Sequence, residues 1–143
     1  MKTLVIYDST YGNTEQVARA MAQALGGPAR KVGAQTPEDL QGLDVLIVGS
    51  PTHGGRPTPE VQALLKSPLS LGGARVAAFD TRVNSRVGEV LFGFAADRIG
   101  RLLEQGGATL RVKPEGFFVL GNRGPVKPGE LERAAAWARQ VAG

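Results

Sequence analysis

The sequence predicts a doubly wound α/β domain, in which helices cover both faces of a parallel sheet. Two observations carry this prediction. Short, continuous apolar segments, typical of parallel strands buried on both faces, alternate with segments whose apolar residues have helical spacing. Glycines and prolines stand where these helices should start and stop, and no stretch has the composition of an interdomain linker. We therefore expect residues 1–143 to form one domain.

Apolar segments predict the strands. The clearest are residues 3–7 and 44–49, which lack the alternation of half-exposed strands. The remaining candidates are residues 75–79, 108–112, 117–120 and, as a weaker segment, 30–32. With the helices between them, these segments amount to five βα units.

Apolar residues at i, i+3 or i+4 predict four longer helices. Their apolar stripes are Val17/Met21/Leu25, Val61/Leu64/Leu65, Leu91/Ala95/Ile99/Leu102 and Leu131/Ala135/Ala138/Val141. A short helix is expected over residues 37–40. The pairs at 26–27 and 106–107 are glycines, which suit left-handed C-caps, and Pro59 and Pro128 suit the first turns of helices.

Composition excludes several function classes. The 143 residues include no Cys and one His, His53. We therefore expect no disulfide, thiol nucleophile, metal site or Ser-His-Asp triad. The net charge is +4, but no run of basic residues or nucleic-acid-binding motif occurs, so no nucleic-acid partner is expected. The first apolar segment ends at Asp8, too early for a signal peptide or membrane span, which predicts a cytoplasmic protein.

The loop after the first strand has the chemistry of a phosphate site. It reads Asp8-Ser9-Thr10-Tyr11-Gly12-Asn13-Thr14 and leads directly into a predicted helix. Hydroxyls, an amide side chain, a turn-forming glycine and the N–H groups of a helix N-terminus all favour an anion. The loop has no lysine and no G-x-G-x-x-G, so it matches neither a P-loop nor a dinucleotide site. Alternatively, Ser9 or Thr14 merely caps the helix.

Together with G-S-P-T-H-G-G after the third strand, S-T-Y-G-N-T resembles the motifs of the flavodoxin family. The family's phosphate motif, [T/S]-x-[T/aromatic]-G-x-T, matches Ser9, Tyr11, Gly12 and Thr14. The resemblance implies a three-layer α/β/α sandwich with a five-stranded parallel sheet in the order 2-1-3-4-5, and FMN as cofactor. It implies that the FMN phosphate is held by Ser9, Thr10, Tyr11, Gly12, Asn13 and Thr14.

The second and third loops should lie beside the flavin ring if the resemblance holds. In the second loop, residues 49–59, the resemblance assigns five residues to the ring: Pro51, Thr52, His53, Gly54 and Gly55. From residues 80–88 it assigns Thr81, Arg82 and Asn84. This third loop departs from the family pattern, because it lacks the tyrosine that commonly stacks on the flavin. One face of the ring is therefore expected to lack an aromatic cover.

Charge is a second departure from the family. Arg56, Arg82 and Arg86 fall in the predicted flavin-side loops, where electron carriers of the family are usually acidic. A guanidinium near N1 and O2 would favour the anionic reduced flavin and raise its potential. The alternative is that these arginines are solvated surface residues.

The resemblance implies an FMN-binding electron-transfer flavoprotein. We expect a monomer that takes electrons from an NAD(P)H-dependent reductase and passes them to an acceptor with an acidic face. Two alternatives remain open at this point: an FMN-dependent NAD(P)H or quinone oxidoreductase, and a flavodoxin-fold interaction module without cofactor. An electron carrier fits the first two loops better than a stand-alone enzyme does.

Overall fold

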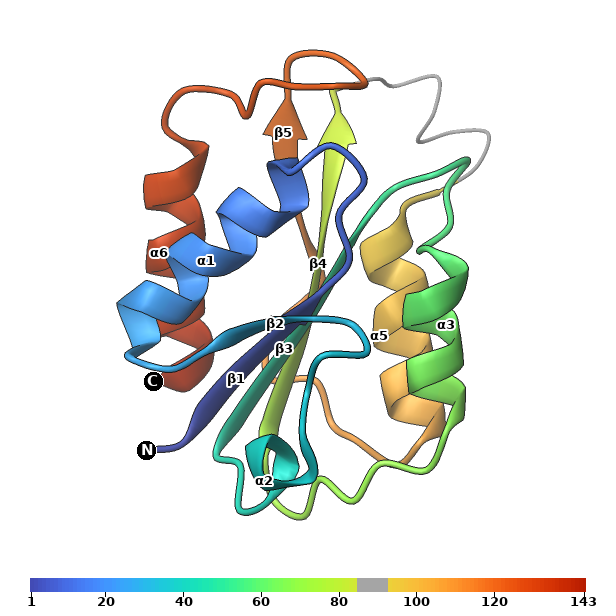
Figure 1. The fold of residues 1–143 in the computed structure, drawn as a ribbon, viewed down its shortest axis with the longest axis vertical. Coiled ribbons are helices and arrows are strands. Elements are labelled where there is room, and N and C mark those ends of the chain that lie inside the picture. The colour runs from blue at the N-terminus through green and yellow to red at the C-terminus, as the bar shows by residue number, and fades with distance from the viewer. Residues whose placement is uncertain (85–92) are drawn as a thin grey trace.

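The computed structural model describes residues 1–84 and 93–143 and has the predicted α/β architecture (Figure 1). Its elements in chain order are β1 (Thr3–Tyr7), α1 (Asn13–Leu25), β2 (Ala29–Lys31), α2 (Pro37–Leu40), β3 (Val45–Pro51), α3 (Pro59–Lys66), β4 (Arg75–Val83), α5 (Ala95–Gln105), β5 (Glu115–Val119) and α6 (Glu130–Ala142). No helix in these two ranges is long and apolar enough to cross a membrane.

The five strands form one parallel sheet in the order β2-β1-β3-β4-β5, which confirms the predicted order. The chain reverses direction across the sheet between β1 and β3, so the loops after these strands diverge at their carboxyl ends. Figure 1 shows these ends, with the loops that follow β1, β3 and β5, at the top of the molecule. A ligand crevice is therefore expected at this edge.

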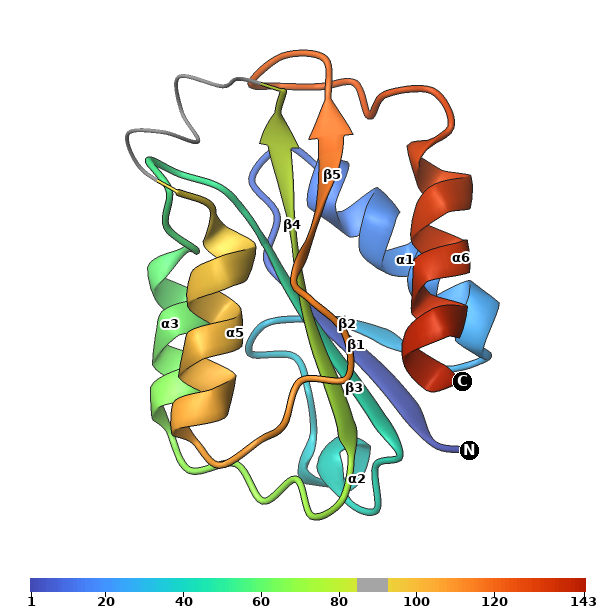
Figure 2. The same ribbon diagram turned by 180° about the vertical axis from the view of Figure 1, so that it is seen from behind.

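Two layers of helices cover the sheet. Helices α1 and α6 lie on one face, and α3 and α5 lie on the other (Figures 1 and 2). Under α1 and α6, Phe79, Phe117 and Trp137 pack edge to face with ring centroids 5.8–6.5 Å apart. Under α3 and α5 the core is aliphatic and includes Leu4 and Ile99. Burial on both faces explains why the strands read as continuous apolar segments.

The helix boundaries follow the predicted signals in part. Gly26 caps α1 with φ 73°, and Pro59 occupies the first turn of α3 behind the N-cap Thr58, as predicted. The prediction for Pro128 is wrong, because α6 begins at Glu130 after the left-handed N-cap Gly129. After α5 it is Gly107, at φ 96°, that takes the left-handed conformation. The apolar residue Leu91, predicted for this helix, lies outside the described residues.

The prediction of a strand over residues 108–112 is also wrong. Within this stretch Leu110 forms a single bridge to Val76 of β4, and β5 begins only at Glu115. Pro114 lies between the two and has no N–H for a ladder. Leu110 instead packs against the core under α3 and α5, which accounts for the apolar character of the segment.

Candidate functional site

A cavity of about 270 Å³ opens at the carboxyl edge of the sheet. It is lined by Ser9, Thr10, Tyr11, Asn13, Thr14, Pro51, Thr52, His53, Thr81, Arg82, Val83 and Asn122. The three predicted loops therefore meet around one space. Of the predicted site residues, those that do not line it are Gly12, Gly54, Gly55 and Asn84.

The loop after β1 is folded by its own side chains. The Asp8 carboxylate accepts a hydrogen bond from the Ser9 amide (2.8 Å), and the Ser9 hydroxyl accepts from the amides of Gly12 (3.0 Å) and Glu15 (3.3 Å). Gly12 has φ 89°, a conformation that other residues rarely adopt. Gly12 thus shapes the loop without lining the cavity. The N-cap of α1 is Gly12, so neither Ser9 nor Thr14 is its capping residue. The Ser9 hydroxyl does accept from the first turn, but most amides of the loop are left unused.

Four amides at the N-terminus of α1 remain available to a ligand. Those of Thr10, Tyr11, Asn13 and Thr14 donate to no protein acceptor within the described residues, and all four residues line the cavity. The Thr14 hydroxyl is 2.7 Å from that of Thr81, which ties the helix start to β4. N–H groups that converge at a helix N-terminus bind an anion without a cationic side chain.

The loop after β3 is a hairpin-like turn closed at two levels. At its base the Thr58 amide donates to the Ser50 hydroxyl (3.0 Å). At its tip the amide of His53 donates to the carbonyl of Arg56 (2.9 Å), and the reverse bond measures 3.1 Å. Gly54 and Gly55 between them have φ 58° and 80°, as a tight two-residue turn of this type requires. The turn holds His53 with Nε2 3.4 Å from the Thr10 hydroxyl.

The segment after Phe79 is not a loop at first, because β4 continues to Val83. Thr81 and Arg82 therefore lie on a strand, and Asn84 beyond it is exposed and does not line the cavity. The Arg82 guanidinium forms two hydrogen bonds to the buried Asp80 carboxylate, at 2.7 and 2.8 Å. Arg82 is therefore paired with Asp80 and mostly buried, and is not the solvated surface residue of the alternative. Its effect on the flavin potential stays a prediction. Arg56 is exposed outside the cavity lining, and Arg86 lies outside the described residues.

Comparison with known proteins identifies the family. The family model of the flavodoxin domain matches residues 4–90, more than half of the chain. The chain belongs to the flavodoxin family. A curated relative from Synechocystis, named as a diflavin flavoprotein A 4, is 37% identical over 79 residues, which are 49% of this chain and 13% of the relative. The chain thus spans about an eighth of that relative's length.

Solved flavodoxins share the whole fold. A flavodoxin from the domain Archaea superimposes with TM-score 0.80 at 21% identity, covering 99% of this chain and 96% of that one. Oxidised Flavodoxin 2 from Bacillus cereus gives TM-score 0.79 at 24% identity, with 99% and 98% covered. Flavodoxin domains bind FMN, and the anion site at the N-terminus of α1 fits its phosphate.

The loop after β5 contributes residues that the motifs did not predict. Asn122 lines the cavity, and the Arg123 guanidinium lies 5.7 Å from the ring centroid of Tyr11. A Cβ on Gly124 would lie 2.5 Å from the Asn13 side chain, so this loop rests directly on the phosphate loop. Gly-Asn at 121–122 and Gly-Pro at 124–125 are sequence signals for such a turn.

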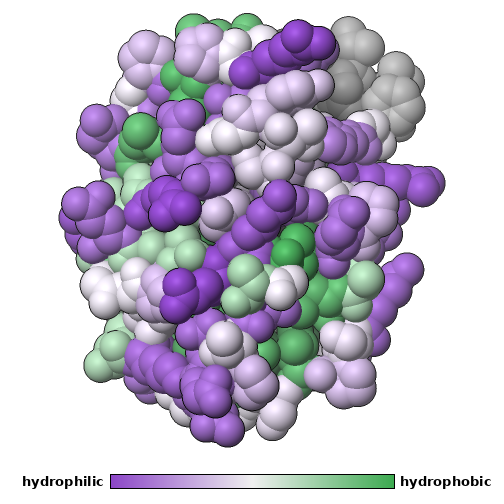
Figure 3. Space-filling model, in the orientation of Figure 1, coloured by the Kyte–Doolittle hydropathy of each residue, from purple (hydrophilic) through white to green (hydrophobic). Residues whose placement is uncertain are grey.

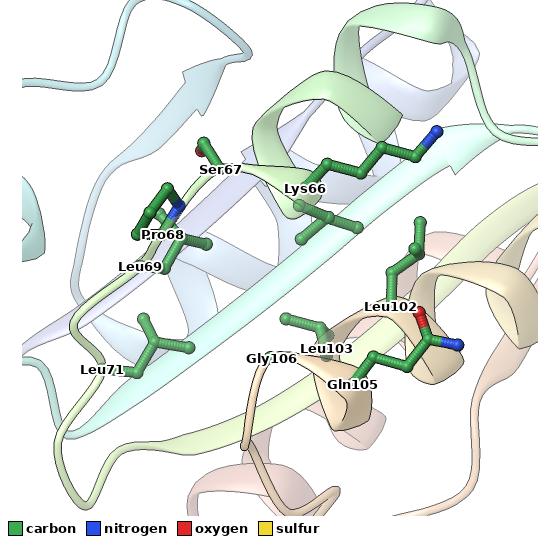
Figure 4. Close-up of a pocket in the computed structure, with 10 residues that line it drawn as sticks. Lys66, Ser67, Pro68, Leu69, Leu71, Leu102, Leu103, Gln105 and Gly106 are labelled. Carbon is green, nitrogen blue, oxygen red and sulfur yellow. The ribbon is translucent and has the colours of Figure 1, made fainter.

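A second cavity lies at the opposite, amino edge of the sheet and has a different character (Figure 4). Its volume is about 440 Å³, and five of its ten lining residues are leucines: Leu65, Leu69, Leu71, Leu102 and Leu103. Figure 4 shows Leu71 and Leu103 pointing into the space between α5 and the connection from α3 to β4. On the face seen in Figure 3, hydrophobic surface gathers in the lower right half, on the side of α3 and α5. Few polar groups converge there, so it does not resemble a flavin site.

Proposed function

We propose that this flavodoxin domain binds FMN in the carboxyl-edge cavity and carries electrons between a reductase and an acceptor. The observation that supports this proposal is that four residues lining one cavity at the N-terminus of α1, Thr10, Tyr11, Asn13 and Thr14, have amides that donate to no acceptor within the described residues. These donors would hold the phosphate. Thr52, His53 and the end of β4 would border the ring. When bound, FMN supplies the redox chemistry, and the chain sets its orientation and access.

The size of the cavity supports a carrier. At about 270 Å³ it falls below the roughly 300–1,000 Å³ of pockets that enclose a small-molecule ligand. A molecule as large as FMN would therefore keep part of its surface outside the cavity. An exposed ring edge permits electron transfer to a second protein without opening the fold.

The partners in this proposal are an NAD(P)H-dependent reductase and an acceptor with an acidic docking face. The formal net charge of +4 favours an acidic partner, and such association weakens as salt rises. The Synechocystis relative is a flavoprotein by name, and this chain corresponds to 13% of it. A flavin domain of this kind can therefore be part of a larger redox protein.

A stand-alone oxidoreductase is the second candidate, and one observation favours it. Among the described residues that line the cavity, Tyr11 supplies the one Phe, Tyr or Trp ring, and it is 54% exposed. An uncovered flavin face could admit a flat nicotinamide or quinone. The cofactor-free module remains as the outcome in which FMN does not bind.

Calorimetric titration of the apoprotein tests cofactor binding. We expect one equivalent of FMN to bind, and riboflavin, which lacks the phosphate, to bind at least 100-fold more weakly. No heat with FMN would contradict the proposal, and equal affinity for riboflavin would remove the phosphate site from it. The loaded protein should then oxidise NADPH in the presence of a quinone only when a reductase is added. Turnover without reductase would establish the oxidoreductase instead.

A further inference from the structure

Asp80 is a buried carboxylate that the phosphate motif does not involve. It lies near the end of β4, its side chain is fully buried, and its oxygens accept hydrogen bonds from Arg82 Nε (2.7 Å), Arg82 Nη2 (2.8 Å) and the Ala96 amide (2.9 Å). A buried charge is stable in a fold only when it is paired in this way. Burial raises the pKa of Asp80, and the hydrogen bonds from Arg82 oppose the shift.

The Arg82 guanidinium is held on two sides besides Asp80. Its Cζ lies 3.4 Å from the ring centroid of Phe94, at the start of α5. A Cβ on Gly116 of β5 would lie 2.2 Å from the same atom, so the guanidinium occupies the space that a side chain there would need. The Arg82 side chain is therefore 17% exposed, although the residue lines the cavity.

The N-terminus of α5 connects Asp80 to the loop after β3. The Ala96 amide donates to the Asp80 carboxylate (2.9 Å), and the neighbouring Ala95 amide donates to the Thr52 hydroxyl (3.2 Å). Thr52 lines the cavity from the end of the neighbouring strand β3, and its amide donates to the Thr81 carbonyl (3.0 Å). Asp80 thus holds Arg82 directly and is linked to Thr52 through the start of α5.

The Asp80–Arg82 pair determines the net charge beside the cavity. Within the described residues, Arg82 is the one permanently charged residue of the lining, and Asp80 cancels its charge. Reduction adds negative charge to a flavin, so a free guanidinium in the lining would bind reduced FMN better than oxidised FMN. A neutralised guanidinium gives little such preference.

We propose that Asp80 is a positioning residue: it fixes Arg82 in the wall of the carboxyl-edge cavity and, by cancelling the Arg82 charge, keeps the potential of bound FMN lower than an unpaired arginine would keep it. This inference rests on the proposed function for its cofactor. It reverses the expectation that Arg82 itself raises the potential.

The test compares midpoint potentials of bound FMN in Asp80→Asn, in Asp80→Asn combined with Arg82→Gln, and in Asp39→Asn. Asp80→Asn should raise the potential by about 30 mV or more, which is a tenfold gain in affinity for reduced over oxidised FMN in a two-electron couple. The double variant has no charge at either position and should return to the wild-type potential. Asp39→Asn removes the carboxylate of the Arg30–Asp39 pair, away from the cavity, and should change nothing.

Thermal unfolding of each apoprotein gives a second readout. A loss of stability in Asp80→Asn without a change in potential would overturn the proposal, because the carboxylate would then be structural alone. A double variant that keeps the raised potential would overturn it as well. If Asp80→Asn does not fold, Asp80→Ser replaces it: it also leaves the Arg82 charge uncancelled, so a rise of the same sign and at least threefold in the affinity ratio is expected, and no rise contradicts the proposal. A wild-type protein that does not bind FMN would instead refute the proposed function.

Discussion

Two cavities described above lie at opposite edges of one sheet, and the one with the greater volume has fewer groups suited to bind a polar ligand. The amino-edge cavity has about 440 Å³ and a wall of leucines, whereas the carboxyl-edge cavity has about 270 Å³ and a wall of hydroxyls, amides and free N–H groups. The chemistry of the wall, and not the volume, distinguishes the flavin site from a gap in packing.

Helix direction explains the difference. At the carboxyl edge the chain enters helices, so N–H groups are left without intrahelical partners. At the amino edge helices end, and here the carbonyls are already used: those of Ala63 and Leu64 accept from Ser67 (3.2 Å), and those of Leu102 and Leu103 accept from Gly106 (3.1 Å). Parallel topology therefore places unpaired donors at one edge and capped carbonyls at the other.

Among the substitutions that test this difference between the two edges, a negative charge in the phosphate loop should have the largest effect, a loss of FMN affinity. Thr10 is exposed and lines the cavity, so Thr10→Asp should be tolerated by the fold. At about 4 Å from a phosphate, one carboxylate costs about 4 kcal/mol at an effective dielectric of about 20, or roughly a thousandfold in affinity. Calorimetry against Thr10→Asn, which has the same shape without charge, measures the loss. Equal FMN affinity in the two variants would place the phosphate elsewhere.

A core substitution at the amino edge should affect stability alone. Leu103 is 3% exposed, and Leu103→Ala enlarges the leucine cavity. We expect a loss of about 3 kcal/mol in the free energy of unfolding, from lost burial and the added void. Urea unfolding of the apoprotein measures it, and FMN titration of the folded variant should give an unchanged Kd. More than a tenfold change in Kd would show that the two edges are coupled.

Glu130 tests how the carboxyl-edge loop after β5 is anchored. Its carboxylate accepts from Arg133 (2.8 Å) and from the Phe118 amide (2.8 Å), and the Arg133 hydrogen bonds hold the pKa of Glu130 below its usual range. Glu130→Gln should cost about 2 kcal/mol of unfolding free energy at pH 7, a typical value for charged hydrogen bonds.

The pH dependence of this effect has a definite sign. Because the pKa of Glu130 is lower in the folded state, its contribution is present above the unfolded value of about 4.3 and is lost as the pH falls through the folded value. Denaturation of wild type and Glu130→Gln between pH 3 and 7 should therefore show a gap that closes in acid. A gap that is constant with pH would mean that the carboxylate charge contributes nothing.

The smallest effect is expected at the rim of the flavin site. Arg123 stacks at 5.7 Å on the exposed Tyr11 of the phosphate loop, an interaction of about 0.5–1 kcal/mol. Arg123→Gln should weaken FMN binding about two- to fivefold at low salt and less at high salt. Arg139→Gln removes an exposed cation on α6 and serves as the matched control. An identical effect of both variants would mean that net charge, and not position, matters.

The phosphate loop and the helix it enters could be predicted from sequence because both depend on neighbouring residues. Ser9 and Gly12 fold the loop from within, and the apolar stripe of α1 follows its own period. Two residues were missed: Asn122, which lines the cavity, and Arg123, which lies over the Tyr11 ring. Both depend on the position of β5 beside β4. The segment that contains them matches no motif, and nothing in its local sequence indicates that β5 lies beside β4.

The sequence by itself determined the alternation of strands and helices, the strand order implied by its family motifs, and the polar loop that meets α1. Apolar periodicity and turn chemistry depend on residues that are close in the chain, so these patterns can be recognised in the sequence. The tertiary structure decided that Asp80 neutralises Arg82, that residues 108–112 do not form a strand, and that the two edges carry such different cavities. These features depend on which segments become neighbours in the sheet, and a charge or an apolar run has no fixed role until its neighbours are in place.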